Sequence, residues 1–339
     1  MSLTRRNFLI RGAAGAVGAL AAAASDRLPI AAASRATDHA KTHGGNLTVG
    51  EVDLKRLGFD PTRYLTQFDW GRATRLPNGR TLREYTVVAS EREIEIAPGV
   101  FFPAWVFNGT VPGPTLRARE GDQVRVKLIN ASKHPHTLHF HGFHKAEMDG
   151  VPGIGRGDVL PGETFTYEFE AAPFGLHLYH CHSQPLKRHI HKGLYGTFII
   201  DPKQDRPSAR EMVMMMNGFD TNFDSENEVY AVNTVAFHYA KHPIRVRRGE
   251  LVRIYLVNLT EFDPINSIHI HGNFFHVYRT GTSLTTTEFT DTIMLCQAER
   301  AVLEMRFPYA GRYMFHAHQT EFTELGWMGL FEVTGDDAV

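Results

Sequence analysis

G-D-Q-V-R-V-K-L-I-N at Gly121–Asn130 and G-E-L-V-R-I-Y-L-V-N at Gly249–Asn258 are two copies of one pattern. In each copy, apolar residues alternate with polar or aromatic ones, which is the period of a half-buried β-strand. H-F-H-G follows the first copy from His139, and H-I-H-G follows the second copy from His269. An internal repeat of this length predicts two β domains of one kind.

Length and composition agree with that organisation. The chain has 339 residues, room for two domains at roughly 150 residues each. Its 42 % hydrophobic and 22 % charged residues are typical of a globular protein, and its net charge of −1 argues against a broad nucleic-acid surface. Two cysteines are too few for a disulfide scaffold. We expect an all-β protein, with twin β-sandwiches joined near residues 202–208 rather than one continuous barrel.

The first residues have the pattern of an export signal. Arg5 and Arg6 precede a weakly apolar stretch over residues 13–24, which is shorter than the ~20 residues that a membrane-spanning helix needs. Paired arginines before such a stretch are typical of a twin-arginine signal peptide. We therefore expect a signal over residues 1–33, a periplasmic or secreted protein, and no stable membrane insertion.

An extension is expected between the signal and the first β domain. Over residues 34–80 the clearest helix signal begins at Asp60, a good N-cap, with Pro61 in the first helical position. Gly71 is the expected end of this short helix.

Four H-x-H pairs stand at corresponding places in the two copies. Side chains at i and i+2 of a strand lie on one face, so the two rings of each pair point the same way. Four such pairs in register with a repeat predict metal binding. The pairs are His139 and His141, His180 and His182, His269 and His271, and His316 and His318.

Strand parity predicts a second site in the first domain. Cys181 stands between the two histidines of its pair, so its sulfur faces the opposite side of the strand. His136, three residues before His139, also faces away from its pair, and His189 follows Cys181 after a loop. Two imidazoles and one thiolate form the trigonal ligand set of a blue copper site.

The second domain lacks this extra set. Asn266 stands where the first domain has His136, and Ala317 replaces Cys181. One thiolate-bound copper is therefore expected per chain. Cys296 has no such neighbours and is predicted to be a plain core thiol.

With these motifs in place, the chain resembles a laccase-like, two-domain multicopper oxidase with its type 1 copper in the first domain. The resemblance implies two consecutive cupredoxin-like Greek-key β-sandwich domains, over residues 81–203 and 204–339. The motifs that carry it are F-N-G-T-V-P-G-P at 107–114, H-x-x-H-x-H at 136–141 and H-C-H at 180–182.

The resemblance also implies four coppers per chain, one of type 1, one of type 2 and a type 3 pair. By this resemblance the type 1 ligands are His136, Cys181 and His189, and the type 2 ligands are His139 and His269. The type 3 ligands would be His141, His180, His182, His271, His316 and His318.

The type 1 loop departs from the familiar laccase pattern. It is longer than usual, which leaves His191 as a competitor of His189. His189 is preferred because it stands five residues before the axial position, as in the family. That position holds Leu194, which cannot coordinate, so a comparatively high reduction potential is expected.

The expected reaction follows from the resemblance. A small reductant gives single electrons to the type 1 copper through the exposed edge of His189, and O₂ is reduced to two waters at the cluster. Cys181 is the covalent neighbour of His180 and His182, which makes the route between the centres short. The reduction of O₂ to water also consumes protons, so an acidic side chain is expected beside the cluster.

Asp149, in M-D-G-V-P, resembles the acid found beside the cluster in related oxidases, although an aspartate before Gly150 is also a common turn residue. Glu321 and Glu324 are weaker candidates. The donor class stays open among phenols, aromatic amines, metal ions and a small redox protein. Related proteins close the cluster between subunits, so a homotrimer is expected.

Two rival functions were weighed. A copper-containing nitrite reductase shares the fold, but that family has an aspartate in place of His139, no histidine in place of His182 and usually an axial methionine. A non-enzymatic periplasmic copper-binding protein would explain many histidines, but not a thiolate between two of them.

The remaining motifs have simpler interpretations. M-V-M-M-M at residues 212–216 is predicted to be a buried strand rather than a methionine-rich copper site. His134, His144 and His276 are predicted to support the ligands or to lie on the surface. Lys187 and Arg188 either steer an anionic donor or are merely solvated.

Overall fold

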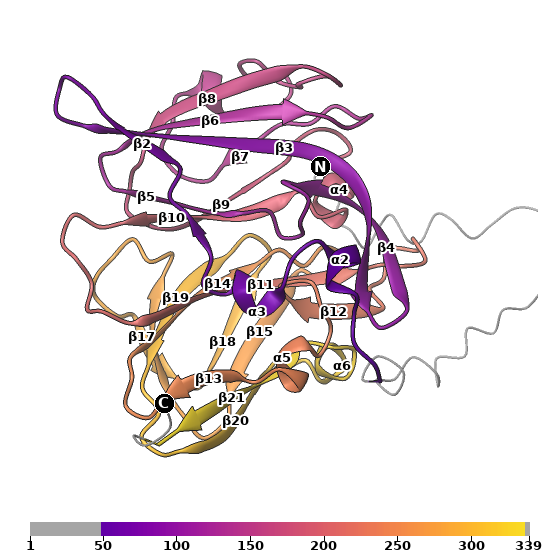
Figure 1. The fold of residues 1–339 in the computed structure, drawn as a ribbon, viewed down its shortest axis with the longest axis vertical. Helices are drawn as coiled ribbons and strands as arrows, with labels where there is room; N and C mark the ends of the chain where they lie inside the picture. The colour runs from indigo at the N-terminus through magenta and orange to yellow at the C-terminus, as the bar shows by residue number, and fades with distance from the viewer. Residues whose placement is uncertain (1–48, 336–339) are drawn as a thin grey trace, which may run out of the picture. The chain divides into compact units, whose positions relative to one another are not determined.

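Four β-sheets make up the part of the chain that the computed structural model describes, residues 49–335 (Figure 1). The predicted signal over residues 1–33 lies outside the described residues. Two sheets come from the first half of the chain. One contains β2 (Arg72–Arg75), β3 (Thr81–Ala97), β4 (Val100–Phe107), β6 (Gln123–Asn130) and β8 (Thr164–Glu170), and the other contains β1 (Phe68–Asp69), β5 (Thr115–Arg119), β7 (His139–Phe140), β9 (Gly175–His180) and β10 (Tyr195–Asp201).

The other two sheets come from the second half. One contains β11 (Arg210–Phe219), β12 (Val229–Val232), β14 (Val252–Asn258), β16 (Phe275–Arg279), β17 (Glu288–Thr290) and β19 (Arg300–Met305). The last contains β13 (Ile244–Arg247), β15 (Ile265–Ile270), β18 (Thr292–Cys296), β20 (Gly311–His316) and β21 (Met328–Thr334).

Between residues 49 and 335, helices are few and short. They are α2 (Leu54–Leu57), α3 (Pro61–Tyr64), the 3₁₀ turn Ala146–Met148, α4 (Leu186–His191), α5 (His238–Lys241) and α6 (Thr320–Glu324). Within the described residues, no helix has the length and apolar character that a membrane crossing requires.

The repeat in the sequence is also a repeat in the topology. β6 pairs in parallel with β3 and antiparallel with β8. β14 pairs in parallel with β11 and antiparallel with β19, so the two quoted stretches occupy equivalent places. The prediction of an all-β fold with two sandwiches is confirmed, and the strands of the first half end at Asp201 before those of the second begin at Arg210.

Three apolar cores hold the four sheets together. One fills the first sandwich and contains Val126 and Cys181, and a second fills the other sandwich and contains Ile254. The third joins the halves, because Leu178 of β9 packs in the same cluster as Met215 of β11. Buried apolar area of this kind is the main favourable contribution to folding.

The alternation predicted for β14 is only partly right. β6 alternates between buried and less buried residues, as predicted. All seven residues of β14 are buried, because the outer face of its sheet packs against the first half. There Arg253 is neutralised by Glu304 at 2.6 Å and Glu211 at 3.0 Å.

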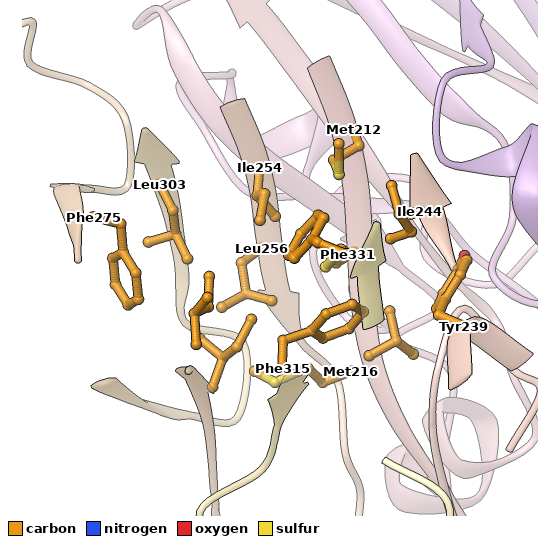
Figure 2. Close-up of a cluster of buried hydrophobic side chains, with 14 of the residues drawn as sticks. Met212, Met216, Tyr239, Ile244, Ile254, Leu256, Phe275, Leu303, Phe315 and Phe331 are labelled. Atoms are coloured by element: carbon orange, nitrogen blue, oxygen red, sulfur yellow. The ribbon is translucent and has the colours of Figure 1, made fainter. Parts of the chain in front are cut away.

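The methionine stretch is a strand, as predicted. Residues 212–216 lie in β11 and are almost completely buried. Met212 and Met216 point into the core of the second sandwich with Leu256 and Phe315, as Figure 2 shows.

The predicted helix after Asp60 begins where expected but is shorter. The Asp60 carboxylate accepts a hydrogen bond from the Thr62 amide at 2.8 Å, and the helix ends at Tyr64. Gly71 instead follows β1 with a positive φ of 60°. The turn ends early because Tyr64 is drawn into the core, where its hydroxyl donates to the Gly113 carbonyl.

Candidate metal centres

The three predicted type 1 residues converge on one point in the first sandwich. The Sγ of Cys181 lies 3.2 Å from Nδ1 of His189 and 3.7 Å from Nδ1 of His136. The two Nδ1 atoms are 3.3 Å apart. A trigonal ion with bonds of about 2.0–2.3 Å, the lengths known for zinc, separates its ligands by about 3.5–4 Å. The three donors therefore already have close to the spacing that one metal ion requires.

Local structure explains this convergence. Cys181 directly follows β9, and its amide donates to the Leu194 carbonyl at 2.9 Å, which closes the loop that carries α4. The Thr137 amide lies 3.3 Å from Sγ, and the His182 amide donates to the Thr137 hydroxyl at 2.8 Å. Thr137 thus ties the two ligand segments together.

Burial sets the charge state of the triad. Removal from water lowers the pKa of His136 to about 3 and that of His189 to about 4, so both rings are neutral near pH 7. Burial raises the pKa of the Cys181 thiol. A bound cation reverses the effect on the thiol, because metal coordination favours the thiolate.

His189, and not His191, belongs to this triad. Nε2 of His191 accepts a hydrogen bond from the Asp220 amide at 3.1 Å, and its ring packs against Phe102 and Phe262. The side chains of residues 189 and 191 leave a helix about 200° apart, so they cannot face the same point.

Leu194 is fully buried in the same apolar cluster as Cys181. Its carbonyl orients the cysteine amide, while its side chain offers no donor atom. The sequence predicted that the Leu194 side chain occupies the axial position of the copper, and this stays a prediction.

We predict that Leu194→Met lowers the reduction potential of the thiolate centre. A thioether ligand stabilises Cu(II), and each tenfold gain in relative Cu(II) affinity lowers a one-electron potential by about 59 mV. The swap conserves volume, so the loss of stability should stay below about 1.5 kcal/mol. Spectroelectrochemical titration measures the effect, with Leu116→Met from the same core as control. An unchanged potential in Leu194→Met would show that this side chain does not face the copper.

Four rings of the first half form half-site 1, defined as His139, His141, His180 and His182. β7 and β9 place His139 directly opposite His180. The ring centroid of His139 lies 5.1–5.4 Å from those of the other three. The Nε2 atoms of His141 and His180 approach to 3.4 Å.

Four rings of the second half form half-site 2, defined as His269, His271, His316 and His318. β15 and β20 place His269 opposite His316. The ring centroid of His269 lies 4.9–5.5 Å from the other three, and the Nε2 atoms of His271 and His316 approach to 2.9 Å. The geometry repeats that of half-site 1, as strand parity predicted.

Backbone carbonyls fix the tautomers of several rings. Nδ1 of His180 lies 2.8 Å from the Cys181 carbonyl, and Nδ1 of His316 contacts the Ala317 carbonyl at 2.5 Å. A carbonyl only accepts, so each Nδ1 carries the proton and each Nε2 presents a lone pair. A metal-binding imidazole is usually held in this way through its other nitrogen.

The two half-sites do not meet within one chain. Among residues 49–335, each group of three or more donor atoms within 4.8 Å of one another draws on the first half or the second, never both. Burial also differs, since His180 is buried whereas His271 and His318 are exposed. Within one chain, each half-site therefore brings together only four of the eight histidines of the H-x-H pairs.

The second sandwich has no counterpart of the thiolate triad because a tryptophan fills that place. The Ala317 amide donates to the Trp327 carbonyl, as that of Cys181 does to Leu194. The buried Trp327 indole donates to Oδ1 of Asn266 at 3.0 Å. The exchange of His136 for Asn266 and of Cys181 for Ala317 is visible in the sequence, whereas the packing of Trp327 on Asn266 is seen only in the structure.

The predicted electron entry at an exposed edge of His189 is wrong. His189 as a whole residue is only 2 % exposed. Trp105 of β4 covers it at 4.8 Å between ring centroids, and the Arg188 guanidinium covers Trp105 in turn. His134 stacks on the same tryptophan at 4.5 Å, so it supports the site rather than binding in it.

The prediction of a core position for Cys296 is also wrong, because this thiol is exposed. It ends β18, the edge strand of its sheet, where one side of the strand has no neighbour to bury it.

Asp149 lies beside half-site 1. Its carbonyl oxygen is 2.8 Å and its Oδ1 is 3.3 Å from Nδ1 of His139, and Oδ1 is 3.7 Å from Nε2 of His144. Glu321 and Glu324 are exposed on α6. Of the three candidate acids, Asp149 alone contacts a half-site ring in the described part of the chain.

The fold and the thiolate triad define the class of cupredoxin-like copper proteins. Two multicopper oxidase family models match the chain, over residues 89–205 and 205–337. A solved multicopper oxidase is 59 % identical, covers 84 % of this chain and 100 % of its own, and superposes with a TM-score of 0.83. The chain belongs to the multicopper oxidase family.

More distant relatives include different activities. The copper-containing nitrite reductase of Neisseria gonorrhoeae is 30 % identical over 67 % of this chain, which spans 62 % of that enzyme's length. Laccase 1 of Metarhizium acridum is 41 % identical over 29 % of this chain and 16 % of its own. The family makes this chain a copper-binding oxidoreductase, and the reaction is not decided by likeness alone.

The residues present fit copper. The thiolate and two neutral imidazoles of the triad are the ligand set of a blue copper centre. Nδ1 of His182 is buried without a hydrogen-bond partner, so one more donor of half-site 1 is available to an ion. The triad is therefore a candidate site for one copper ion.

Proposed function

We propose that the protein is a laccase-like oxidase that reduces O₂ to water at a three-copper cluster, with electrons from a phenol, an aromatic amine or a metal ion. One observation carries the proposal: the triad sulfur belongs to the residue between two rings of half-site 1. The ligand assignment given by the resemblance is kept, with four coppers per chain.

Bound copper would supply storage of single electrons and their transfer to O₂. The chain supplies the connection. From the Cys181 sulfur, the backbone leads directly to His180 and His182, and the Cys181 carbonyl also contacts Nδ1 of His180 at 2.8 Å. The Thr137 amide, 3.3 Å from the sulfur, stabilises its negative charge.

A homotrimer would complete the cluster, with half-site 1 of one subunit facing half-site 2 of the next. Exposed aromatic side chains beside both half-sites support such an interface. Phe143, next to half-site 1, is 70 % exposed, and Phe274 and Phe289, next to half-site 2, are 50 % and 62 % exposed. Exposed apolar patches of this kind mark protein interfaces. Head-to-tail contacts of this type close into a ring of three when the rotation between neighbouring subunits is about 120°.

Export through a twin-arginine signal over residues 1–33 remains part of the proposal. The paired Arg5 and Arg6, followed by a weakly apolar stretch over residues 13–24, support this export route.

Asp149 is the proposed proton donor. We predict that Asp149→Asn lowers the turnover number about 10- to 100-fold, because the amide cannot deliver the protons that O₂ reduction consumes. Turnover measured across pH, together with copper content, tests this, with exposed Glu147→Gln as control. A full rate and unchanged pH profile in Asp149→Asn would contradict the role.

A direct comparison of the two acceptors tests the proposed function. The copper-loaded protein is given a methoxyphenol with O₂, or a reduced dye with nitrite under anaerobic conditions. We expect O₂ uptake with the phenol and no nitric oxide from nitrite. Nitric oxide production without O₂ uptake would establish a nitrite reductase, and the absence of both reactions would favour a copper-binding protein.

A further inference from the structure

A cavity of about 600 Å³ lies on the side of α4 that faces the second half of the chain. We name it the α4 pocket, and its walls include Lys187, Arg188 and Lys192 from the first half and Phe223 and Phe262 from the second. Its volume is in the range of small-molecule sites, about 300–1,000 Å³. The copper ligands described above do not line it.

Two phenylalanines give the pocket aromatic walls. Phe223 is 53 % exposed although it is a large apolar side chain. Phe223 and Phe262 have positive φ values of 65° and 71°, a conformation that bulky residues rarely adopt. Both rings are therefore held at the cavity by a strained backbone, where an aromatic ligand can stack on them.

Three cations give the pocket an excess of positive charge. In the described part of the chain, Lys187, Arg188 and Lys192 form no ion pair with a carboxylate. The ammonium groups of Lys187 and Lys192 lie over Phe262 and Phe223, at 4.6 Å and 4.3 Å from the ring centroids.

The one acid at the pocket offsets only part of this positive charge. Asp220 accepts backbone hydrogen bonds from residues 223, 224 and 225 within its own loop. Burial and the nearby Arg188 lower the pKa of Lys192 to about 8, and the charge of Asp220 opposes this shift. Lys192 is only 7 % exposed and donates to the Pro103 carbonyl at 2.9 Å. A buried ammonium with donors to spare favours an incoming anion.

The pocket lies close to the triad but not on it. Lys187 and His191 are four residues apart and share one face of α4, whereas His189 points to the opposite face. A molecule in the pocket is thus separated from the His189 ring by about one helix diameter, ~10–12 Å. Because Trp105 covers His189, this pocket is an alternative place from which electrons reach the triad.

We propose that the α4 pocket binds an aromatic carboxylate, and that a phenolic acid bound there is the electron donor; this rests on the proposed oxidase function. The ring packs against the phenylalanines, and the carboxylate pairs with the ammonium groups that lie over them. Each phenol loses one electron and one proton to become a phenoxyl radical, its carboxylate unchanged. Four phenols reduce one O₂ to two waters, so that atoms and electrons balance.

Equilibrium binding tests the pocket without turnover. Calorimetry on the copper-loaded full chain compares 4-methoxybenzoate, which has no oxidisable phenol, with 4-methoxybenzyl alcohol, its neutral counterpart. We expect the carboxylate to bind at least tenfold more tightly at low salt, and Lys187→Gln to remove most of this preference. Equal affinities of the two probes would overturn the inference.

Two further variants sharpen the result. Lys127→Gln, on an exposed position of β6, should leave the preference intact. Lys192→Gln should weaken the preference for the carboxylate further. Lys192 is buried, so this variant can fail to fold. In that case the variant of the exposed Lys187 still tests the pocket. A loss of preference in Lys127→Gln as well would mean that only overall charge matters, which would contradict a built pocket.

Kinetics separates the pocket from the proposed function. kcat/KM for 4-hydroxy-3-methoxybenzoate and for its benzyl alcohol analogue is measured by O₂ uptake. A selective drop for the acid in Lys187→Gln, about tenfold, supports the pocket. O₂ uptake with both donors and no effect of the variant overturns the pocket but leaves the oxidase standing. No O₂ uptake with either donor overturns the oxidase, whereas calorimetry still reports on the pocket.

Discussion

Cys181→Ser is expected to abolish the blue colour of the copper-loaded protein and to lower turnover with any donor by more than about 100-fold. Removing a partner that only orients a ligand typically costs 10- to 100-fold, and in the proposed site Cys181 is itself a ligand as well as the covalent link to His180 and His182. A serine hydroxyl does not ionise near pH 7 and is a hard donor, so it cannot replace the thiolate. The type 1 copper should be lost while the other coppers stay.

The chain offers a matched control for this change. Cys296→Ser alters the other cysteine, which is exposed at the end of β18, and should leave colour, copper content and turnover unchanged. Absorption spectra, copper analysis and O₂ uptake are measured on both variants. A Cys181→Ser protein that keeps its colour or its rate would show that this sulfur is not on the electron route.

Mixing two inactive variants is expected to restore activity. His141→Ala damages half-site 1 and His271→Ala damages half-site 2, and each homotrimer should have less than about 1 % of the normal rate because every cluster lacks a ligand. In a mixed ring, the undamaged half-site 1 of a His271→Ala subunit can face the undamaged half-site 2 of a His141→Ala subunit. Each mixed trimer then contains one complete cluster out of three, so about one third of the wild-type rate should return.

Co-expression with two different affinity tags isolates the mixed oligomers for this test. His276→Ala, exposed near half-site 2 but outside it, serves as control and should remain active without mixing. If doubly tagged oligomers are recovered and stay inactive, the cluster is not shared between subunits. If each single variant is fully active, the half-sites are not where O₂ reacts.

Much of the site followed from the sequence because strands impose a strict geometry. Alternation alone placed His139 with His141 and turned Cys181 to the other face, and the structure brings these groups together accordingly. The repeat likewise predicted that half-site 2 copies half-site 1. The pairing of His139 with His180 joins two strands about 40 residues apart and is seen only in the structure.

What the sequence did not reveal depends on contacts between distant segments. Trp105 covers His189 from a strand 84 residues earlier, and the burial of Arg253 depends on packing between the two halves. Cys296 is exposed because its strand is at a sheet edge, which depends on strand order rather than on local pattern. The walls of the α4 pocket come from both halves of the chain, so no local sequence motif predicts this pocket.

An anaerobic reductive titration tests the central claim most directly. The fully copper-loaded chain is reduced stepwise without O₂, and the electrons taken up are counted before a measured amount of O₂ is admitted. Four electrons per chain, followed by consumption of one O₂ per chain without peroxide, is the result expected from one thiolate copper and one shared cluster of three. Uptake of two electrons per chain, or release of peroxide, would contradict it.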